Sequence, residues 1–519
     1  MKGIYRSAVV LLLSATMLYG QTASKGTQRN ARRSAQPAVT QQDLQALRDS
    51  IQQQQSQLEM LRQELQKRDE QMQQLLQQLQ QAQSAARQAE QKAVAVETNA
   101  NGSQSAVDQL QQDVKDIQQN MTNAALSTQE DQKRMGAIEN TVSRFRFGGD
   151  VRIRYENFYQ ENIPDRHRPR IRLRLGVEGQ LTQDFVGGVY LATGTIEAGN
   201  PTYRDPVSTN ETLTSFFERK AVGFDRGWIA FNPAYAKWLT LTGGKFAFTW
   251  TRTPLTFDND LNPEGFSQKL SYEMKNSVLK NLSLTGMELF FNESGTGVDS
   301  FAAGAQVSSK LQLGQRVTMT PSYTFLNWRN ADVIAANSLI PSGSNATRTL
   351  GGNNLTNATV VTGTGSSARN AFLSRFQYND FILDTNIKTA SARFPLRLAA
   401  EYLKNTRAAT NQDSAFWSEV SLGQTKNARD FVVGYGYARV EQDAVIAAFN
   451  ESDMRAATNV TQHRVFFNYA FSPSVTGNYT LWVGRTLNTA LQNAARAGVP
   501  PGAEDPWLKR MQFDLIYKF

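Results

Sequence analysis

The chain has 519 residues, a formal net charge of +9 and no cysteine. No run of about 18 apolar residues follows the N-terminal region, which excludes a bundle of membrane-spanning helices. Without cysteine, no disulfide can hold an exported chain together. The basic residues alternate with apolar ones rather than cluster on one helix, so composition gives no support for a nucleic-acid partner.

The first residues predict export. Lys2 and Arg6 precede a short apolar stretch over 8–18, and the small residues Gly20 and Ala23 offer cleavage positions. This is the pattern of a secretory signal peptide, because the stretch is too short to span a bilayer; a buried N-terminal helix is the alternative. We expect a signal peptide over 1–23, followed by a flexible basic and polar linker over 24–43.

A seven-residue repeat occupies residues 44–143. Its apolar positions in the first half include Leu44, Leu47, Ile51, Leu58, Leu61 and Leu65. A heptad of this length predicts a periplasmic α-helical coiled coil, whose apolar stripe needs partner helices. The alternative is a disordered glutamine-rich linker, and the polar residues in the seam leave the number of helices open.

From Arg144 the apolar period changes to two. The first segment reads FRFGGDVRIRYE, the second reads PRIRLRLGVEG after a loop containing Pro164, and the chain ends on MQFDLIYKF. Such alternation is typical of strands with one apolar and one polar face. About sixteen segments of this kind occupy 144–519, with short turns and long polar loops alternating between them.

Short turns at one end and long loops at the other predict an antiparallel transmembrane β-barrel of about 16 strands, preceded by the coiled coil. A soluble β-sandwich or propeller is the alternative. In the barrel the apolar rows face lipid and the lumen is polar. The residues expected to line the pore are Arg152, Arg154, Arg170, Arg172 and Arg174.

Six stretches carry a resemblance to a known family. They are GDVRIRYE (149–156), RPRIRLRLGVEG (168–179), ATG (192–194), FDRGWIAFNP (224–233), GGK (243–245) and DNDLNPEG (258–265). With them the chain resembles the bacterial outer-membrane "putative porin" family and, more widely, general and phosphate-selective porins. The resemblance implies passive diffusion of small hydrophilic solutes through trimers in the outer membrane.

The resemblance also implies roles for two groups of residues. The last alternating residues look like the signal that the outer-membrane assembly machinery reads: Phe513, Leu515, Tyr517 and Phe519. In general porins the loop between the fifth and sixth strands folds into the lumen as a constriction. Here that loop would bring Asp258, Asp260 and Glu264 opposite the arginines; a surface loop is the alternative.

An enzyme is the main rival class. The sequence has two histidines, His167 in the first external loop and His463 at a strand start, and neither has a nucleophile at a catalytic spacing. We expect no catalytic residue, metal or cofactor. The expected function is an outer-membrane porin with mild anion preference; the alternative is a structural tether that links the outer membrane to the cell wall through the coiled coil. The expected partners are outer-membrane lipid, the assembly machinery and two further copies of the chain, with peptidoglycan as a candidate and no nucleic acid.

Overall fold

The computed structural model describes residues 143–519, apart from 195–205, 214–215, 218, 276, 296, 339–355 and 366–367. It also describes scattered positions between 84 and 135. Contacts divide the chain into two units, Met1–Ser127 and Thr128–Phe519. The predicted signal peptide, the linker and most of the predicted coiled coil lie outside the described residues; the few described positions of the coil, such as 114–116, are helical. No helix in the described part is long and apolar enough to cross a membrane.

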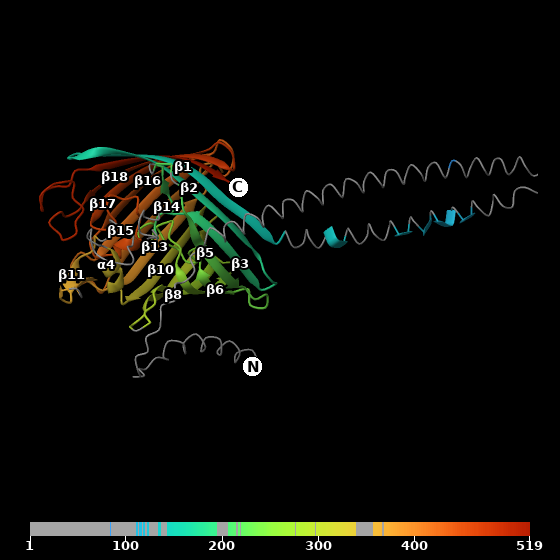
Figure 1. Cartoon of the computed structure of the whole chain (residues 1–519), viewed down its shortest axis with the longest axis horizontal. Helices are drawn as coiled ribbons and strands as arrows, with labels where there is room; N and C mark the ends of the chain where they lie inside the picture. The colour runs from blue at the N-terminus through green and yellow to red at the C-terminus, as the bar shows by residue number, and fades with distance from the viewer. Residues whose placement is uncertain are drawn as a thin grey trace, which may run out of the picture. The chain divides into compact units, whose positions relative to one another are not determined.

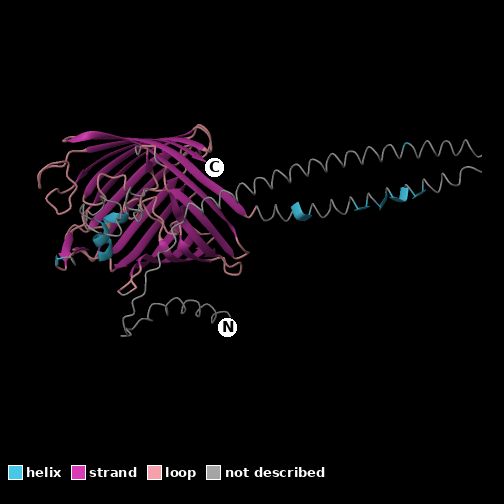
Figure 2. Ribbon diagram, viewed as in Figure 1, coloured by secondary structure: helices cyan, strands magenta, loops and turns pink. Residues whose placement is uncertain are grey.

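The second unit is a closed antiparallel β-barrel (Figures 1 and 2). Its sixteen long strands each pair with the next along the chain, and β19 pairs with β1 to close the ring. The predicted number of strands is confirmed. The first eight are β1 (Phe145–Gln160), β2 (Ile163–Gln180), β3 (Phe185–Thr193), β5 (Val222–Phe231), β6 (Leu239–Lys245), β7 (Glu264–Glu273), β8 (Leu279–Asn292) and β9 (Ser300–Leu313).

The second half of the ring has the same pairing. Its strands are β10 (Val317–Arg329), β13 (Gln377–Ile387), β14 (Leu396–Asn405), β15 (Ser414–Gly423), β16 (Phe431–Val440), β17 (Val460–Ala470), β18 (Val475–Thr486) and β19 (Leu508–Lys518). Smaller elements lie in the long connectors: β4 (Glu211–Thr212), α4 (Asp332–Ser338), β11 (Thr359–Thr362), β12 (Arg369–Phe372) and the 3-10 helix η2 (Ala447–Phe449). The end of the barrel that carries these connectors is called the loop end (left in Figure 1), and the opposite end the turn end.

The connection between β1 and β2 differs from the expectation. The two strands have 16 and 18 residues and continue as a two-stranded hairpin until a tight turn at Glu161 and Asn162. Pro164 and His167 therefore lie on β2, and the predicted loop around Pro164 is wrong. The strand register shifts at this point, where Pro164 and Asp165 of β2 face the single residue Tyr159 of β1. This bulge explains why the proline is tolerated, because a bulged residue needs no ladder hydrogen bond.

The outer surface of the barrel is apolar. On β1 and β2 the residues between the arginines are exposed, among them Ile153 (56%), Leu173 and Leu175. Exposed aromatic residues occur on strands all round the ring, for example Phe266, Phe325, Phe381, Phe467 and Phe513. A one-residue slip of any strand would exchange its two faces, so this division fixes the register of the sheet.

The interior contains more apolar residues than expected. Near the loop end, many inward side chains of β8 to β15 are apolar and buried, and they form an apolar wall with Met287, Leu289, Leu326, Trp328, Tyr378, Leu403 and Trp417. Loops 246–263 and 441–459 fold inward and cover that wall with Leu255, Phe257, Ile446 and Phe449. The expectation of a wholly polar lumen is therefore wrong at this end, because the long loops bury apolar surface inside the barrel.

Candidate functional site

Seven arginines gather on the inner face of β1, β2 and β19. The arginine cluster consists of Arg152 and Arg154 on β1, Arg510 on β19, and four β2 residues, Arg168, Arg170, Arg172 and Arg174. The period of two puts all of them on the face opposite the exposed apolar residues. Strand register places Arg152 directly opposite Arg172, and Arg154 directly opposite Arg170. Like charges in such cross-strand pairs repel, so the cluster requires acidic partners.

Glu156 is the acid at the centre of the cluster. Its Oε1 accepts hydrogen bonds from Arg510 Nη2 at 2.6 Å and from Gln512 Nε2 at 2.9 Å. Its Oε2 accepts one from Arg168 Nε at 2.7 Å, while Arg170 Nη1 stays 3.9 Å away. The Glu156 side chain is fully buried, so its charge depends on these arginines for compensation.

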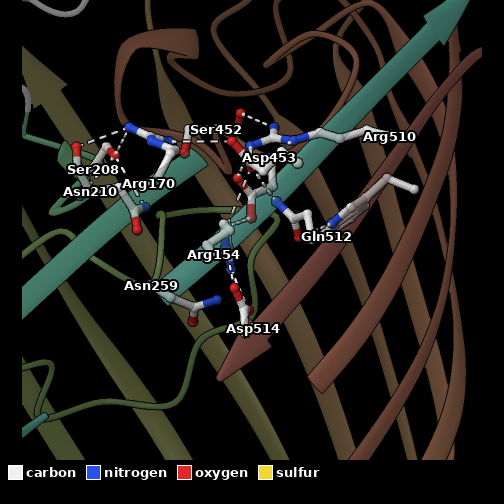
Figure 3. Close-up of polar contacts among 12 residues, drawn as sticks. Arg154, Arg170, Ser208, Asn210, Asn259, Ser452, Asp453, Arg510, Gln512 and Asp514 are labelled. Carbon is white, nitrogen blue, oxygen red and sulfur yellow. Dashed lines mark hydrogen bonds and ion pairs between the residues drawn. The ribbon is translucent and has the colours of Figure 1, made fainter. Parts of the chain in front are cut away.

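Two further acids hold Arg154 (Figure 3). Its Nε and Nη2 form a two-pronged contact with the Asp514 carboxylate of β19, at 2.6 and 2.8 Å. Its Nη1 lies 3.2 Å from Asp453 of loop 441–459, which also accepts a hydrogen bond from Arg510 Nη2 at 2.7 Å. Asp453 thus ties an inward-folded loop to the strand wall.

The residues predicted for a constriction loop have different surroundings. Asp260 accepts a hydrogen bond from Arg174 and lies 3.7 Å from Arg172, so it faces the arginine cluster. Asp258 contacts loop 441–459 instead: its Oδ2 accepts from Ser452 N–H at 2.8 Å. Glu264 begins β7 and pairs with Lys245 on the adjacent strand at 2.8 Å, largely exposed.

Loop 246–263 contacts walls on several sides of the lumen. Besides the contact of Asp260 with β2, the backbone of Thr251 exchanges two hydrogen bonds with the Gln306 amide on β9, at 2.8 and 2.7 Å. Thr253 Oγ1 donates to Glu401 on β14. The loop therefore crosses the inside of the barrel rather than lying on its rim.

Segment 206–213, which includes β4, covers the arginines from the lumen side. Arg170 Nη2 donates to Ser208 Oγ at 3.3 Å and to the Asn210 carbonyl oxygen at 3.0 Å. Arg152 Nη2 donates to the side-chain oxygen of Asn210. Thr209 fixes the segment to loop 246–263, because its N–H and hydroxyl both donate to Asp260 Oδ2, at 3.1 and 2.8 Å.

The cluster carries a small excess of positive charge. Five acids lie within contact of the seven arginines, namely Asp150, Glu156, Asp260, Asp453 and Asp514, which leaves two positive charges over. All five predicted arginines take part, and the structure brings them together with Arg168 and Arg510, which the sequence reasoning missed. Arg510 has a detectable signal, because it shares the inward alternation of Gln512 and Asp514. Asp453 has none, because no periodicity extends through its loop.

The C-terminal residues lie at the barrel seam. Phe513, Leu515 and Tyr517 are exposed on the outer face of β19. Phe519 and Gly149 of β1 exchange backbone hydrogen bonds of 3.1 and 3.2 Å. Gly149 has no room for a side chain, since a Cβ there would lie 2.1 Å from the Arg174 carbonyl oxygen and 2.9 Å from the Phe519 ring.

The histidines lie on strands. His167 on β2 contacts the Asn157 amide oxygen at 2.7 Å, and His463 on β17 contacts the Tyr435 hydroxyl at 2.7 Å. Within the described ranges, no group of three or more histidines and acids has a metal-binding arrangement. The arginine cluster offers fixed charges and hydrogen-bond donors inside the barrel.

Solved barrels resemble this fold at low sequence identity. OprB of Pseudomonas putida has 11% identity and a TM-score of 0.45, with 74% of this chain and 96% of that one covered. OmpF of Salmonella typhi, in a complex with daunomycin, has 9% identity and a TM-score of 0.40, with 72% and 97% covered. The trimer form of OmpT of Vibrio cholerae has 9% identity and a TM-score of 0.38, with 72% and 99% covered.

No curated protein matches the chain in sequence. A family model does match: residues 158–322, which run from the end of β1 into β10, fit the family described as "Putative porin". That segment contains most of the stretches on which the resemblance was based, and the resemblance to the putative porin family is thereby confirmed.

Proposed function

We propose that the protein is an outer-membrane porin, a water-filled channel for passive diffusion of small hydrophilic solutes with a mild preference for anions. The observation that carries the proposal is the closed ring of sixteen strands with exposed apolar side chains outside and charged side chains inside. In hydrocarbon every backbone amide needs a partner, and a closed barrel supplies one without a free edge. The family match supports the same function.

The inward loops support a narrow passage. Loops 246–263 and 441–459 contact both the apolar wall and the arginine cluster, so they occupy part of the lumen and narrow a passage through it. Fixed charges act over about 8 Å at physiological salt, and a narrow passage keeps solutes within that distance. Two uncompensated positive charges then favour anions, and the five neighbouring acids keep the preference mild.

The assembly belongs to the proposal as well. We expect a homotrimer in the outer membrane, inserted by the assembly machinery through its recognition of the C-terminal strand with Phe519. The N-terminal segment would be a periplasmic coiled coil with one helix from each protomer. The tether remains the second candidate: the heptad repeat favours it, and it is compatible with a pore.

Bilayer electrophysiology tests the proposal. Full-length protein purified from membranes is inserted into a planar lipid bilayer, and single-channel conductance and the reversal potential in a KCl gradient are recorded. A porin gives stable steps and a modest reversal potential of the sign for anions, which grows as the salt concentration falls. A folded barrel that inserts without conducting would contradict the proposal and leave the tether as the function. A version lacking residues 44–143 should conduct as the full chain does.

A further inference from the structure

Three arginines of the cluster have a buried Nε without a hydrogen-bond partner among the described residues, namely Arg152, Arg170 and Arg174. Arg174 forms a close ion pair with Asp260, whereas Arg152 and Arg170 have no such close acid there. Arg152 is 8% exposed and takes part in no ion pair within the described part of the barrel. Its Nη2 donates to Asn210, but its Nε has no hydrogen-bond partner. Arg170 is 7% exposed, its Nε is also without a partner, and its nearest acid is 3.9 Å away. An unpaired buried cation is costly, so such a position is suited to a bound anion.

The two guanidinium groups converge on one residue. Arg152 Nη2 donates to the side-chain oxygen of Asn210, and Arg170 Nη2 donates to its backbone oxygen at 3.0 Å (Figure 3 shows Arg170 with Asn210 and Ser208). The two arginines therefore donate to neutral oxygens of Asn210 and Ser208, at a place where a carboxylate would neutralise the guanidinium charges. The other arginines do not need this substitute, because Arg168, Arg172 and Arg174 each form a close ion pair with a carboxylate. Arg154 and Arg510 contact two or more carboxylates each.

We propose that Arg152 and Arg170 form an oxyanion-binding site in the lumen, which takes the phosphate or carboxylate group of a passing solute. Guanidinium groups match both oxyanions because their N–H groups form a planar fork, and such charge-assisted hydrogen bonds are stronger than neutral ones. Rotation of the Asn210 side chain frees Arg152 Nη2, so the anion replaces a neutral acceptor and not an ion-pair partner. The site rests on the proposed porin function and adds to it a solute class and a binding step.

Binding to the purified full-length protein in detergent tests the site without requiring conduction. Inorganic phosphate and acetate are titrated separately by calorimetry at constant ionic strength with chloride as the background ion. Saturable binding of phosphate alone assigns the site to phosphate groups, and saturable binding of acetate alone assigns it to carboxylates. If neither ion shows saturable binding to a folded barrel, the proposal is overturned.

Substitutions at Asn210 give the decisive comparison, because they leave every arginine in place. Asn210→Asp supplies Arg152 with a carboxylate of its own and should weaken oxyanion binding about tenfold or more, as expected for a hydrogen bond to a charged group. Asn210→Ala removes the competing oxygen and should tighten binding severalfold. Ser283→Asp, at a buried inward position of β8, adds the same charge elsewhere in the lumen and should leave binding unchanged.

The outcomes separate the site from the channel. Equal affinities for Asn210→Asp and the unaltered protein would overturn the site, whatever the conductance. Channels that conduct but do not bind either anion would leave the porin function standing without the site. Binding that responds to Asn210→Asp in a barrel that does not conduct would support the site and contradict the porin.

Discussion

Asp453→Asn tests whether loop 441–459 narrows the passage. Asp453 ties this loop to Arg154 at 3.2 Å and to Arg510 at 2.7 Å, and all three side chains are largely buried. Although burial alone would raise the pKa of this carboxyl, Arg510 and Arg154 hold the pKa of Asp453 well below its usual value. The carboxyl therefore stays ionised at neutral pH, and asparagine removes a full charge with almost no change of shape.

The expected cost follows from the geometry. Removal of one partner from a buried ion pair destabilises by about 3–5 kcal/mol, and the lower value is appropriate if the lumen is filled with water, as proposed. About 3 kcal/mol shifts the balance between the inward-folded and the released loop by about a hundredfold. The contacts of Asp258 with Ser452 and the stacking of Phe449 on Trp328 still oppose release. We therefore expect larger and more variable conductance steps, with stronger anion preference because the cluster gains one net positive charge.

Single-channel recording at low and high salt measures both effects. Asp413→Asn is the matched control, because it also removes a carboxylate from an ion pair. Asp413 pairs with Lys404 at 3.1 Å, and Lys404 is half exposed, so this pair lies outside the arginine cluster. Heat-modified mobility on gels shows that each variant is folded. Conductance and reversal potential equal to those of the unaltered channel, in a folded Asp453→Asn barrel, would refute the idea that this loop controls the passage.

Three further predictions concern pH, assembly and the coiled coil. Burial raises the pKa of Glu451 from 4.5 to about 7, so the carboxyl keeps a proton in the inward-folded loop that it loses in a released loop. The stability of the inward-folded loop therefore falls as the pH rises from about 4.5 to 7, and it is constant above pH 7. Conductance should therefore rise over that range, and Glu451→Gln should abolish the rise; a pH response that survives the substitution contradicts this. Deletion of Phe519 removes the backbone contacts with Gly149 and should lower the amount of inserted barrel without changing its single-channel conductance, whereas normal insertion would disprove the assembly role. Replacement of Leu58, Leu61 and Leu65 by aspartate puts charge into the predicted seam and should dissociate the oligomers of the N-terminal segment, which chemical cross-linking detects. An N-terminal segment that is already monomeric without the substitutions would contradict the predicted coiled coil.

The sequence alone determines the strands and their faces. In PRIRLRLGVEG a period of two decides which side chains share a face, because successive residues of any strand point to opposite sides. The contrast between arginine and leucine then decides which face is outward, since a charged residue toward hydrocarbon costs about 2–4 kcal/mol. The alternation of short turns with long loops is equally local, which is why the strand number and the antiparallel order follow from it.

Only the tertiary structure decides which groups meet inside the barrel. Arg510 and Glu156 are 354 positions apart, and Arg154 and Asp453 are 299 apart, so no spacing in the chain relates them. Asp258 and Asp260 are two positions apart yet contact a loop and the arginine cluster respectively, because a loop backbone has no fixed period. Strand faces are set by backbone geometry within a few residues. Ion pairs and inward loops instead depend on closure of the whole ring, which brings the first strand, β1, beside the last strand, β19.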